Sequence, residues 1–372
     1  MKPQGPHGLL PSQTSDEAER ESCVASMRRF FSTELIPGNR ELYRTKILPE
    51  FVKSHGREPA TGSEVSAELG ATFYYRASSL IGRATQELLW DTVGESVERQ
   101  IDDLNAKAKG TGKSVGTLSL DPDMPMPDYI EAVDIHVMPG NFHTELGEDD
   151  VLAGALYDRG AYVFAYGSRG AYNDNLGRLV AQMIQERFPD FEPERILEMG
   201  CGCGSSTLPL KAAWPDAEVH AIDIGAPMLR YAHGRAESLG VPIHFAQQDA
   251  SRTNFPDASF DLVVSIIVLH EMPLHIIRSV LKECHRLLRP GGITLHDGGR
   301  PSDAPPPDAF QQFLSTWFAR HNNEPFGKGC DLERDLVDAG FALEDIFAGS
   351  PAGDEYLKGH IPAHHYVGAV KR

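Results

Sequence analysis

Three glycines at every second position mark ILEMGCGCGSST, residues 196–207, as a candidate ligand-binding turn. The apolar pair Ile196-Leu197 is typical of the end of a buried strand, and STLPLKAAW after the glycines favours a helix. Glycines in a strand-to-helix turn let the backbone bend tightly and approach a ligand that a β-carbon would push away. This stretch therefore predicts a small-molecule site at the end of a strand.

The spacing of these glycines argues against two common nucleotide-binding turns. A P-loop requires a lysine, and residues 201–207 contain none. A dinucleotide fingerprint requires a glycine where this chain has Ser205. Asp223 lies 23 residues beyond Gly200, at the end of a second apolar run, where a carboxylate can accept hydrogen bonds from ribose hydroxyls. Because NAD sites use an acid in the same way, Asp223 indicates a nucleoside without naming it.

Strands and helices alternate from Arg195 onward, which is typical of parallel strands joined by right-handed crossovers. The stretch FDLVVSIIVLH is apolar without alternation, as expected of a central strand that is buried on both faces. The final HHYVGAVKR predicts a closing strand. We expect the other strands at 195–199, 218–223, 242–246, 260–268 and 292–297, and helices at 205–213, 226–238 and 273–288.

The chain before this region has a different texture. Residues 23–109 carry apolar side chains at three- and four-residue spacing, which predicts helices, whereas Gly110–Pro127 is rich in Gly, Pro, Ser and Asp. We expect four regions: a disordered tail at 1–22, a helical N-terminal domain at 23–109, a linker and bridging segment at 110–190, and a sheet domain at 191–372.

Composition excludes several classes of protein. The formal net charge of −18 disfavours a nucleic-acid partner, which needs a basic surface for phosphates. We expect no membrane partner, because no stretch approaches the ~20 apolar residues of a membrane span. The N-terminus lacks a signal-peptide core, and five scattered cysteines form no disulfide framework, so we expect a cytoplasmic protein. Cys201-x-Cys203 lacks the second ligand pair of a zinc site.

Further motifs follow the glycine turn in a fixed order. They are Glu198–Gly204, Asp223, Asp249-Ala250, Phe260-Asp261 and Leu288-Arg289-Pro290-Gly291-Gly292. This set resembles the motifs of class I S-adenosylmethionine-dependent methyltransferases, and GCGCG and VLHEM are most similar to the ubiquinone-biosynthesis type, which methylates small molecules. The resemblance covers roughly residues 160–300 and the closing strand. It implies an α/β fold, a Rossmann-like doubly wound seven-stranded sheet of order 3-2-1-4-5-7-6, here joined to the mainly α-helical N-terminal domain.

The resemblance also implies S-adenosyl-L-methionine as cofactor. Gly200 and Gly202 would line its methionine end, and Glu198 would support the turn or the methionine amine. Asp223 would hold the ribose. The cofactor residues that the resemblance implies are Glu198, Gly200, Gly202, Gly204, Asp223, Ile224, Asp249 and Ala250, the last two at the adenine. Tyr166 or Tyr172, just upstream, would close over the cofactor or else pack between the bridge and the core.

Two histidine–acid pairs are candidates for the transfer chemistry. His270-Glu271 ends the fourth predicted strand and His296-Asp297 the fifth. In the implied strand order these strands are neighbours, about 5 Å apart, so both pairs would share one rim. We take His270 and His296 as the catalytic candidates in one of three roles: a general base, a wall that shapes and polarises the pocket, or, with an acid, ligands of a divalent metal. Our prediction is that no metal is bound.

We therefore expect methyl transfer to a small organic acceptor, with O- or C-methylation favoured. The helical region 23–109 would enclose that acceptor, and it could also form a homodimer. One alternative is a protein or RNA methyltransferase, which would show a basic groove. The other is a non-catalytic module that binds S-adenosylmethionine, which would release no S-adenosylhomocysteine.

Overall fold

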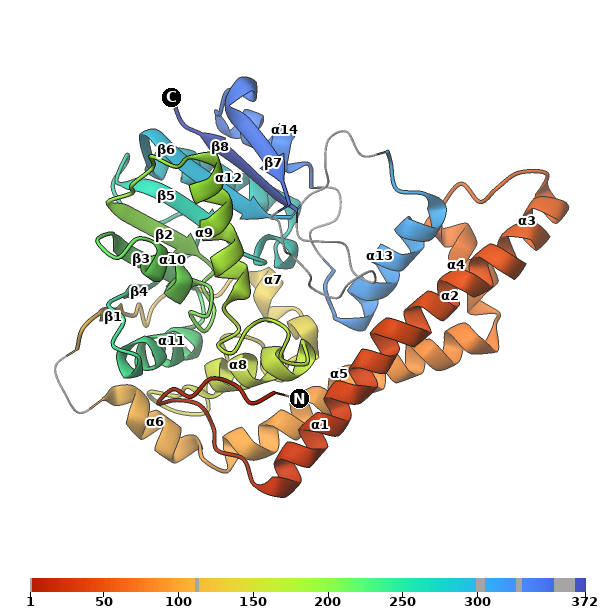
Figure 1. Ribbon diagram of the computed structural model, residues 1–372, viewed down its shortest axis with the longest axis horizontal. Coiled ribbons are helices and arrows are strands. Elements are labelled where there is room, and N and C mark those ends of the chain that lie inside the picture. Colours follow the sequence, from red (N-terminus) through yellow and green to blue (C-terminus); the bar gives the residue numbers. More distant parts are fainter. Residues whose placement is uncertain (1, 111–113, 299–304, 326–329, 351–364) are drawn as a thin grey trace.

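A single eight-stranded sheet forms the centre of the protein in the computed structural model, which describes residues 2–110, 114–298, 305–325, 330–350 and 365–372 (Figure 1). The strand order is β1-β4-β3-β2-β5-β6-β8-β7. The strands are β1 (Thr117–Ser119), β2 (Arg195–Met199), β3 (Glu218–Asp223), β4 (His244–Gln247), β5 (Phe260–Ser265), β6 (Leu288–Asp297), β7 (Ile346–Gly349) and β8 (Tyr366–Val370). All pairs are parallel except those of β8, which runs antiparallel to β6 and β7.

The strand count differs from the expected seven. Numbered from β2, seven strands have the order 3-2-1-4-5-7-6, and β1 adds an eighth beside β4. This strand comes from the segment expected as a linker. Its backbone continues the sheet edge because Thr117 pairs with His244 and Ser119 with Ala246.

Helices cover both faces of the sheet, as expected for a doubly wound fold. One face carries α9 (Asn175–Arg187), α10 (Thr207–Ala213) and α11 (Ala226–Ser238), and the other carries α12 (Leu274–Leu287) and α14 (Leu332–Ala339). Successive strand residues point to opposite faces. In β2, Ile196 joins the first core and Leu197 the second, and both side chains are fully buried.

The N-terminal region is helical from Ser15 to Lys109. Its helices are α1 (Ser15–Phe30), α2 (Ile36–Leu42), α3 (Leu48–His55), α4 (Gly62–Gly70), α5 (Phe73–Glu98) and α6 (Ile101–Lys109), with π-helical turns at Phe31–Leu35 and Tyr43–Ile47. Helices α2, α3 and α4 extend away from the sheet as an arm (Figure 1). Helix α13 (Ala309–His321) lies between β6 and β7 in sequence but packs on this arm, where Phe313 and Trp317 share a core with Leu69.

The expected disordered tail is ordered where the structure describes it. Helix α1 begins at Ser15 with a capping box, in which Thr14 and Glu17 hydrogen-bond each other's backbone N–H groups. Before it, Leu9 is 1% exposed, and His7 Nε2 lies 3.0 Å from the buried Asp158 carboxylate. The segment is held because it covers helix α8 (Leu152–Phe164), which would otherwise expose apolar and charged side chains.

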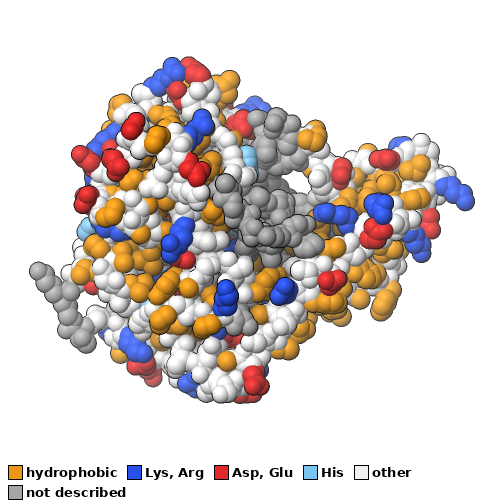
Figure 2. Space-filling view, viewed as in Figure 1, with side chains coloured by type: hydrophobic (Ala, Val, Ile, Leu, Met, Phe, Trp, Pro, Cys, Tyr) orange, Lys and Arg blue, Asp and Glu red, His pale blue; other side chains and the backbone are white. Residues whose placement is uncertain are grey.

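Helix α8 links the N-terminal helices to the sheet region. Its Ala155 and Val163 share a core with Leu89 and Val93 of α5 and with Tyr231 of α11. No helix within the described residues has both the length and the apolar character that crossing a membrane requires. Acidic and basic side chains are interspersed on the face that Figure 2 shows.

Candidate active site

A two-lobed cavity lies at the carboxyl ends of β2 and β3, where parallel sheets bind their ligands. Counted with the open solvent at their mouths, the lobes occupy about 460 Å³ and about 450 Å³. The two lobes share five lining residues: Phe142, Gly200, Asp223, Val268 and Glu271. The lobes therefore adjoin each other, as the two ends of one elongated ligand would require.

The glycine turn forms the floor of the first lobe. Gly200 has φ +71° and a β-carbon there would lie 2.5 Å from Val268, so only glycine fits. Gly202 has φ +52°, and its β-carbon would point into the lobe, 3.5 Å from the nearest atom, in Met228. Gly204 lies behind the turn, facing Ala232 of α11. Two of the three predicted glycines thus line the cavity, and the third shapes the turn.

Glu198 supports this turn from inside the core. Its side chain is fully buried, and its two carboxylate oxygens accept hydrogen bonds from the hydroxyls of Ser206 and Thr207 at the start of α10. Burial raises its pKa to about 7, although both hydroxyls oppose the shift. Of the two roles expected for Glu198, support of the turn is therefore the one that these contacts provide.

Asp223 lies between the two lobes and lines both. Its carboxylate accepts hydrogen bonds from the N–H groups of Gly202 and Gly225, each at 2.9 Å. Burial raises its pKa to about 6, even though these two hydrogen bonds favour the charged form. The second lobe is lined by the predicted Ile224, Asp249 and Ala250, together with Tyr129, Ile130, Gln248 and Met272.

Replacement of Asp223 should weaken S-adenosylmethionine binding and abolish the pH dependence of that binding near pH 6. Above pH 6 the carboxylate is charged and accepts hydrogen bonds, so the affinity of the wild-type protein should fall as the pH drops through 6. Asp223→Asn should lose about 1–3 kcal/mol of binding free energy at neutral pH. Calorimetry at several pH values checks both. A variant that kept the wild-type pH profile, or that changed NAD affinity instead, would contradict the assignment.

Neither predicted tyrosine reaches the cavity. The hydroxyl of Tyr166 donates to Ser32 Oγ at 2.9 Å, and Tyr172 lies against Gly5 in the N-terminal segment. Both therefore pack against the N-terminal region, and neither closes over the cavity; the alternative left open for them, packing between the bridge and the core, named a different partner. The aromatic walls of the cavity are instead Phe142, Tyr157 and Tyr129. No local motif marks these three, because they come from the helix and loops that precede the sheet.

His296 lies inside the sheet, so its expected position at the rim was wrong. Its side chain is fully buried, with Nδ1 2.7 Å from Ser265 Oγ and Nε2 2.8 Å from Thr294 Oγ1. Thr294 precedes His296 by two residues and Ser265 pairs with it across β5, so all three side chains share one face of the sheet, and the imidazole is buried there. Burial lowers the pKa of His296 to about 3 and so keeps the ring neutral. The same burial keeps an acceptor from reaching it.

His296 should make the protein less stable in mild acid. The unfolded chain binds a proton at this histidine below about pH 6.5, whereas the folded chain does not until about pH 3. Stability should therefore fall with decreasing pH below 6.5, by up to about 1.4 kcal/mol per pH unit from this residue alone. Urea unfolding of wild type and His296→Gln at pH 7 and pH 5 isolates the contribution of His296 to the pH dependence of stability. The buried carboxyl groups of Glu198 and Asp223 are present in both proteins and cancel in the comparison. Equal pH dependence in the two proteins would contradict it.

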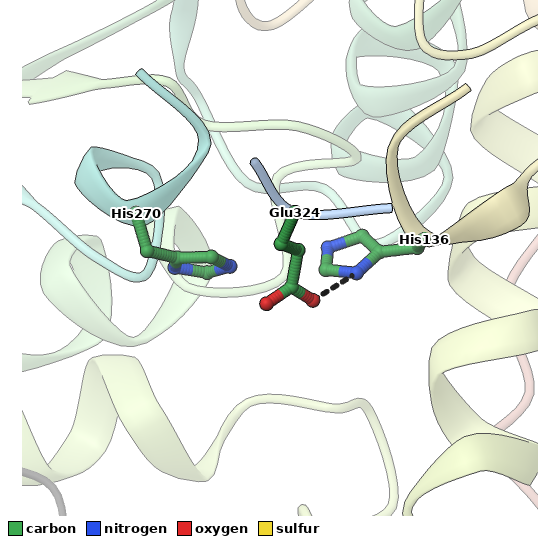
Figure 3. A group of neighbouring side chains, drawn as sticks. All are labelled: His136, His270 and Glu324. Atoms are coloured by element: carbon green, nitrogen blue, oxygen red, sulfur yellow. Dashed lines mark ion pairs between the residues drawn. The ribbon is translucent and has the colours of Figure 1, made fainter. Parts of the chain in front are cut away.

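His270 does lie near the cavity, in a cluster that the sequence did not predict. It occupies the 3-10 turn Leu269–Glu271, and its Nε2 lies 4.0 Å from Glu271 Oε1. His136 contacts Glu271 through Nε2 at 3.0 Å and Glu324 through Nδ1 at 2.9 Å. Figure 3 shows His136, His270 and Glu324 converging from three separate segments.

The two carboxylates control the charge of His136. Burial alone would lower its pKa, but the hydrogen bonds to Glu271 and Glu324 outweigh burial and raise its pKa to about 10. As it stands His136 is therefore an imidazolium that donates hydrogen bonds and is no base at neutral pH. His270, whose side chain is 42% exposed, is the accessible histidine of the cluster.

Comparison with known proteins supports the resemblance to methyltransferases. Residues 196–292 match the family model of a methyltransferase domain. Demethylmenaquinone methyltransferase of Thermus thermophilus is 34% identical over 128 residues, which are 34% of this chain and 56% of that protein. Fatty-acid O-methyltransferase of Mycolicibacterium smegmatis is 31% identical over 131 residues, 35% and 46% of the respective chains. O-methyltransferase cnsE of Penicillium expansum is 27% identical over 242 residues, which cover 63% of this chain and 79% of that protein.

The chain contains a class I S-adenosylmethionine-dependent methyltransferase domain. It spans about half the length of the first two curated relatives. The residues at the cavity fit the cofactor of this family. A β-carbon at Gly202 would fill part of the first lobe, and the carboxylates of Asp223, Asp249 and Glu271 suit a ligand that carries a positively charged sulfur.

Proposed function

We propose that the protein transfers a methyl group from S-adenosylmethionine to a small organic acceptor, with O- or C-methylation favoured. The pair of adjoining lobes carries this proposal. One lobe is floored by Gly202, the other is walled by Asp249, and Glu271 beside His270 borders both. The names of two relatives, a fatty-acid O-methyltransferase and another O-methyltransferase, support oxygen as the favoured acceptor atom.

The cofactor would occupy both lobes. We assign the methionine end to the lobe at Gly200 and Gly202, the ribose to Asp223 between the lobes, and the adenine to the lobe at Asp249 and Ala250. When bound, the cofactor supplies an activated methyl carbon, so this chain needs mainly to align the acceptor and to exclude water. Glu198 acts through the turn, because it holds the start of α10 without reaching the cavity.

The acceptor would lie at the side of the cavity where His270 and His136 stand. Neither histidine lines the two lobes, but Glu271 joins them to the lobes through its contacts with both. Helix α5 contacts this side, because Gln86 Nε2 and Trp90 Nε1 both donate to the His136 carbonyl, at 2.7 Å and 2.8 Å. These contacts support the part of the proposal in which the N-terminal helices help to form the acceptor pocket.

Charge favours a small acceptor over a polyanion. Among the described residues, those that line one lobe or the other include three carboxylates, Asp223, Asp249 and Glu271, and neither lysine nor arginine. A phosphate chain brought beside these lobes would meet like charge, which is unfavourable in a partly buried site. An apolar or weakly polar molecule with one reactive oxygen or acidic carbon would meet no such repulsion.

The test is release of S-adenosylhomocysteine by the full-length protein with a panel of small acceptors that carry hydroxyl, carboxyl or acidic C–H groups. Mass spectrometry of the products identifies the methylated atom. We expect turnover with at least one apolar hydroxyl or carboxyl compound. Transfer to added protein or RNA but to no small acceptor would contradict the proposal, and so would tight cofactor binding without any transfer.

A further inference from the structure

Although the sequence led us to predict that no metal is bound, we propose that His136, His270 and Glu324 form a binding site for a divalent transition-metal ion, with Glu271 orienting His136. One potential ligand atom from each of the three residues lies within 4.8 Å of the others. Figure 3 shows the three side chains directed toward a common point from segments far apart in the sequence. Two imidazoles and one carboxylate are a ligand set that suits zinc, manganese or iron.

The contacts of His136 match those of a metal-binding histidine. Its Nδ1 lies 2.9 Å from Glu324 Oε1, a hydrogen-bond distance slightly shorter than the roughly 3.0–3.4 Å between adjacent ligand atoms that each lie about 2.1 Å from one ion. Its other nitrogen, Nε2, lies 3.0 Å from Glu271 Oε1. A ligating histidine almost always donates its second N–H to such a carboxylate, which fixes the ring and its tautomer.

The backbone around His136 is held in an unfavourable conformation that presents this ring. His136 and Val137 have φ of +57° and +61°, in the left-handed region that a β-branched residue such as Val137 rarely adopts. The His136 carbonyl is fixed by two donors from α5, Gln86 and Trp90. Strain of this kind persists where the surroundings determine it, and here it points an imidazole at His270 and Glu324.

Glu324 is positioned in a similar way. The preceding Asn323 has φ +51°, and its side chain donates to the Asp134 carbonyl at 3.2 Å while accepting from Arg83 Nη1 at 3.1 Å. Asn323 thus ties the segment after α13 to the segment that carries His136. His136 comes from the bridging segment, His270 from the turn after β5 and Glu324 from the segment after α13, so the cluster is assembled by the tertiary fold.

Three protein ligands leave coordination positions open, which is typical of catalytic rather than structural metal sites. The open side is at His270, whose side chain is 42% exposed, whereas those of His136 and Glu324 are each 20% exposed. The preference for Zn²⁺ or Mn²⁺ over Mg²⁺ follows from the two imidazoles, because Mg²⁺ favours oxygen ligands. An ion there could bind an acceptor oxygen, and this role alone rests on the proposed function.

The experiment uses the full-length protein, stripped with a chelator and dialysed, and titrated by calorimetry with Zn²⁺, Mn²⁺ and Mg²⁺. We expect one Zn²⁺ or Mn²⁺ to bind per chain, and Mg²⁺ to bind more weakly. His136→Ala, His270→Ala and Glu324→Gln should each weaken binding at least tenfold, and Glu271→Gln about 10- to 100-fold. His275→Ala, an exposed histidine of α12, is the matched control and should bind as wild type does.

Co²⁺ added to the wild-type protein provides a readout that needs no variant, since ligation by two imidazoles shifts and strengthens the weak ligand-field absorption of hexaaquo Co²⁺. Absence of stoichiometric binding and of that absorption would overturn the proposal and leave His136 as an imidazolium between two carboxylates. Binding that survives all three ligand variants would also overturn it. Because metal binding is measured directly, this failure is distinguishable from failure of methyl transfer, which S-adenosylhomocysteine release reports.

Discussion

Gly202→Val should abolish S-adenosylmethionine binding while the fold persists. A β-carbon at Gly202 meets no protein atom closer than 3.5 Å, so the added side chain has space only within the first lobe. There it would occupy the volume that we assign to the methionine end of the cofactor. We expect a loss of at least about 100-fold in affinity, equivalent to about 2.7 kcal/mol, measured by calorimetry.

The matched control is Gly240→Val. Gly202 and Gly240 have φ of +52° and +69°, so valine introduces left-handed strain at both, but a β-carbon at Gly240 meets nothing within 4 Å. Both variants should lose similar stability in thermal unfolding, and only Gly202→Val should lose the cofactor. Unchanged affinity in Gly202→Val would remove this lobe from the cofactor site. Equal loss of affinity in both variants would show that strain, and not occupied volume, is responsible.

The parts of the fold that sequence predicts well are those buried within the sheet. Strands β2 and β3 and helix α11 begin and end at the predicted residues, because long apolar runs bounded by turn residues specify them. Strand β1 was missed because it has three residues, lies at the sheet edge, and follows Gly- and Ser-rich sequence. Only its pairing with β4 makes it a strand, and pairing is not a property of the local sequence.

The same distinction separates the two halves of the site. Gly200, Gly202 and Asp223 follow directly from strand ends, so their position at the cavity could be predicted from spacing. His136 and Glu324 stand in segments without periodicity or motif, and they reach His270 only because α5 and the segment after α13 close around it.

His296 shows a different limit. The fourth and fifth predicted strands are adjacent in the sheet, as expected, and Ser265 of β5 pairs with His296 of β6. Its side chain is nevertheless buried, because it lies on the face of β6 that also carries Thr294, beside Ser265 of β5. The end of this strand at Asp297 was predicted correctly, but whether a side chain near that end is covered depends on what packs against that face.

Of the two histidines predicted as catalytic, only His270 should matter directly for turnover. Its side chain is 42% exposed and lies 4.0 Å from Glu271, which lines both lobes, whereas His296 is fully buried. His270→Ala should lower kcat by about 100-fold or more, the range for loss of a positioned acid–base or polarising group. Cofactor affinity should stay within about twofold, because His270 lines neither lobe.

Steady-state release of S-adenosylhomocysteine, measured beside calorimetric cofactor affinity, separates these effects. His275→Ala removes an exposed imidazole from the next helix and should keep the wild-type kcat. His296→Gln should keep most of it too, since that side chain contacts Ser265 and Thr294 inside the sheet and can act only through stability. If His270→Ala turned over at the wild-type rate, the acceptor would have to lie elsewhere along the cavity. If His296→Gln alone lost turnover with unchanged stability, the assignment of the two histidines would have to be reversed.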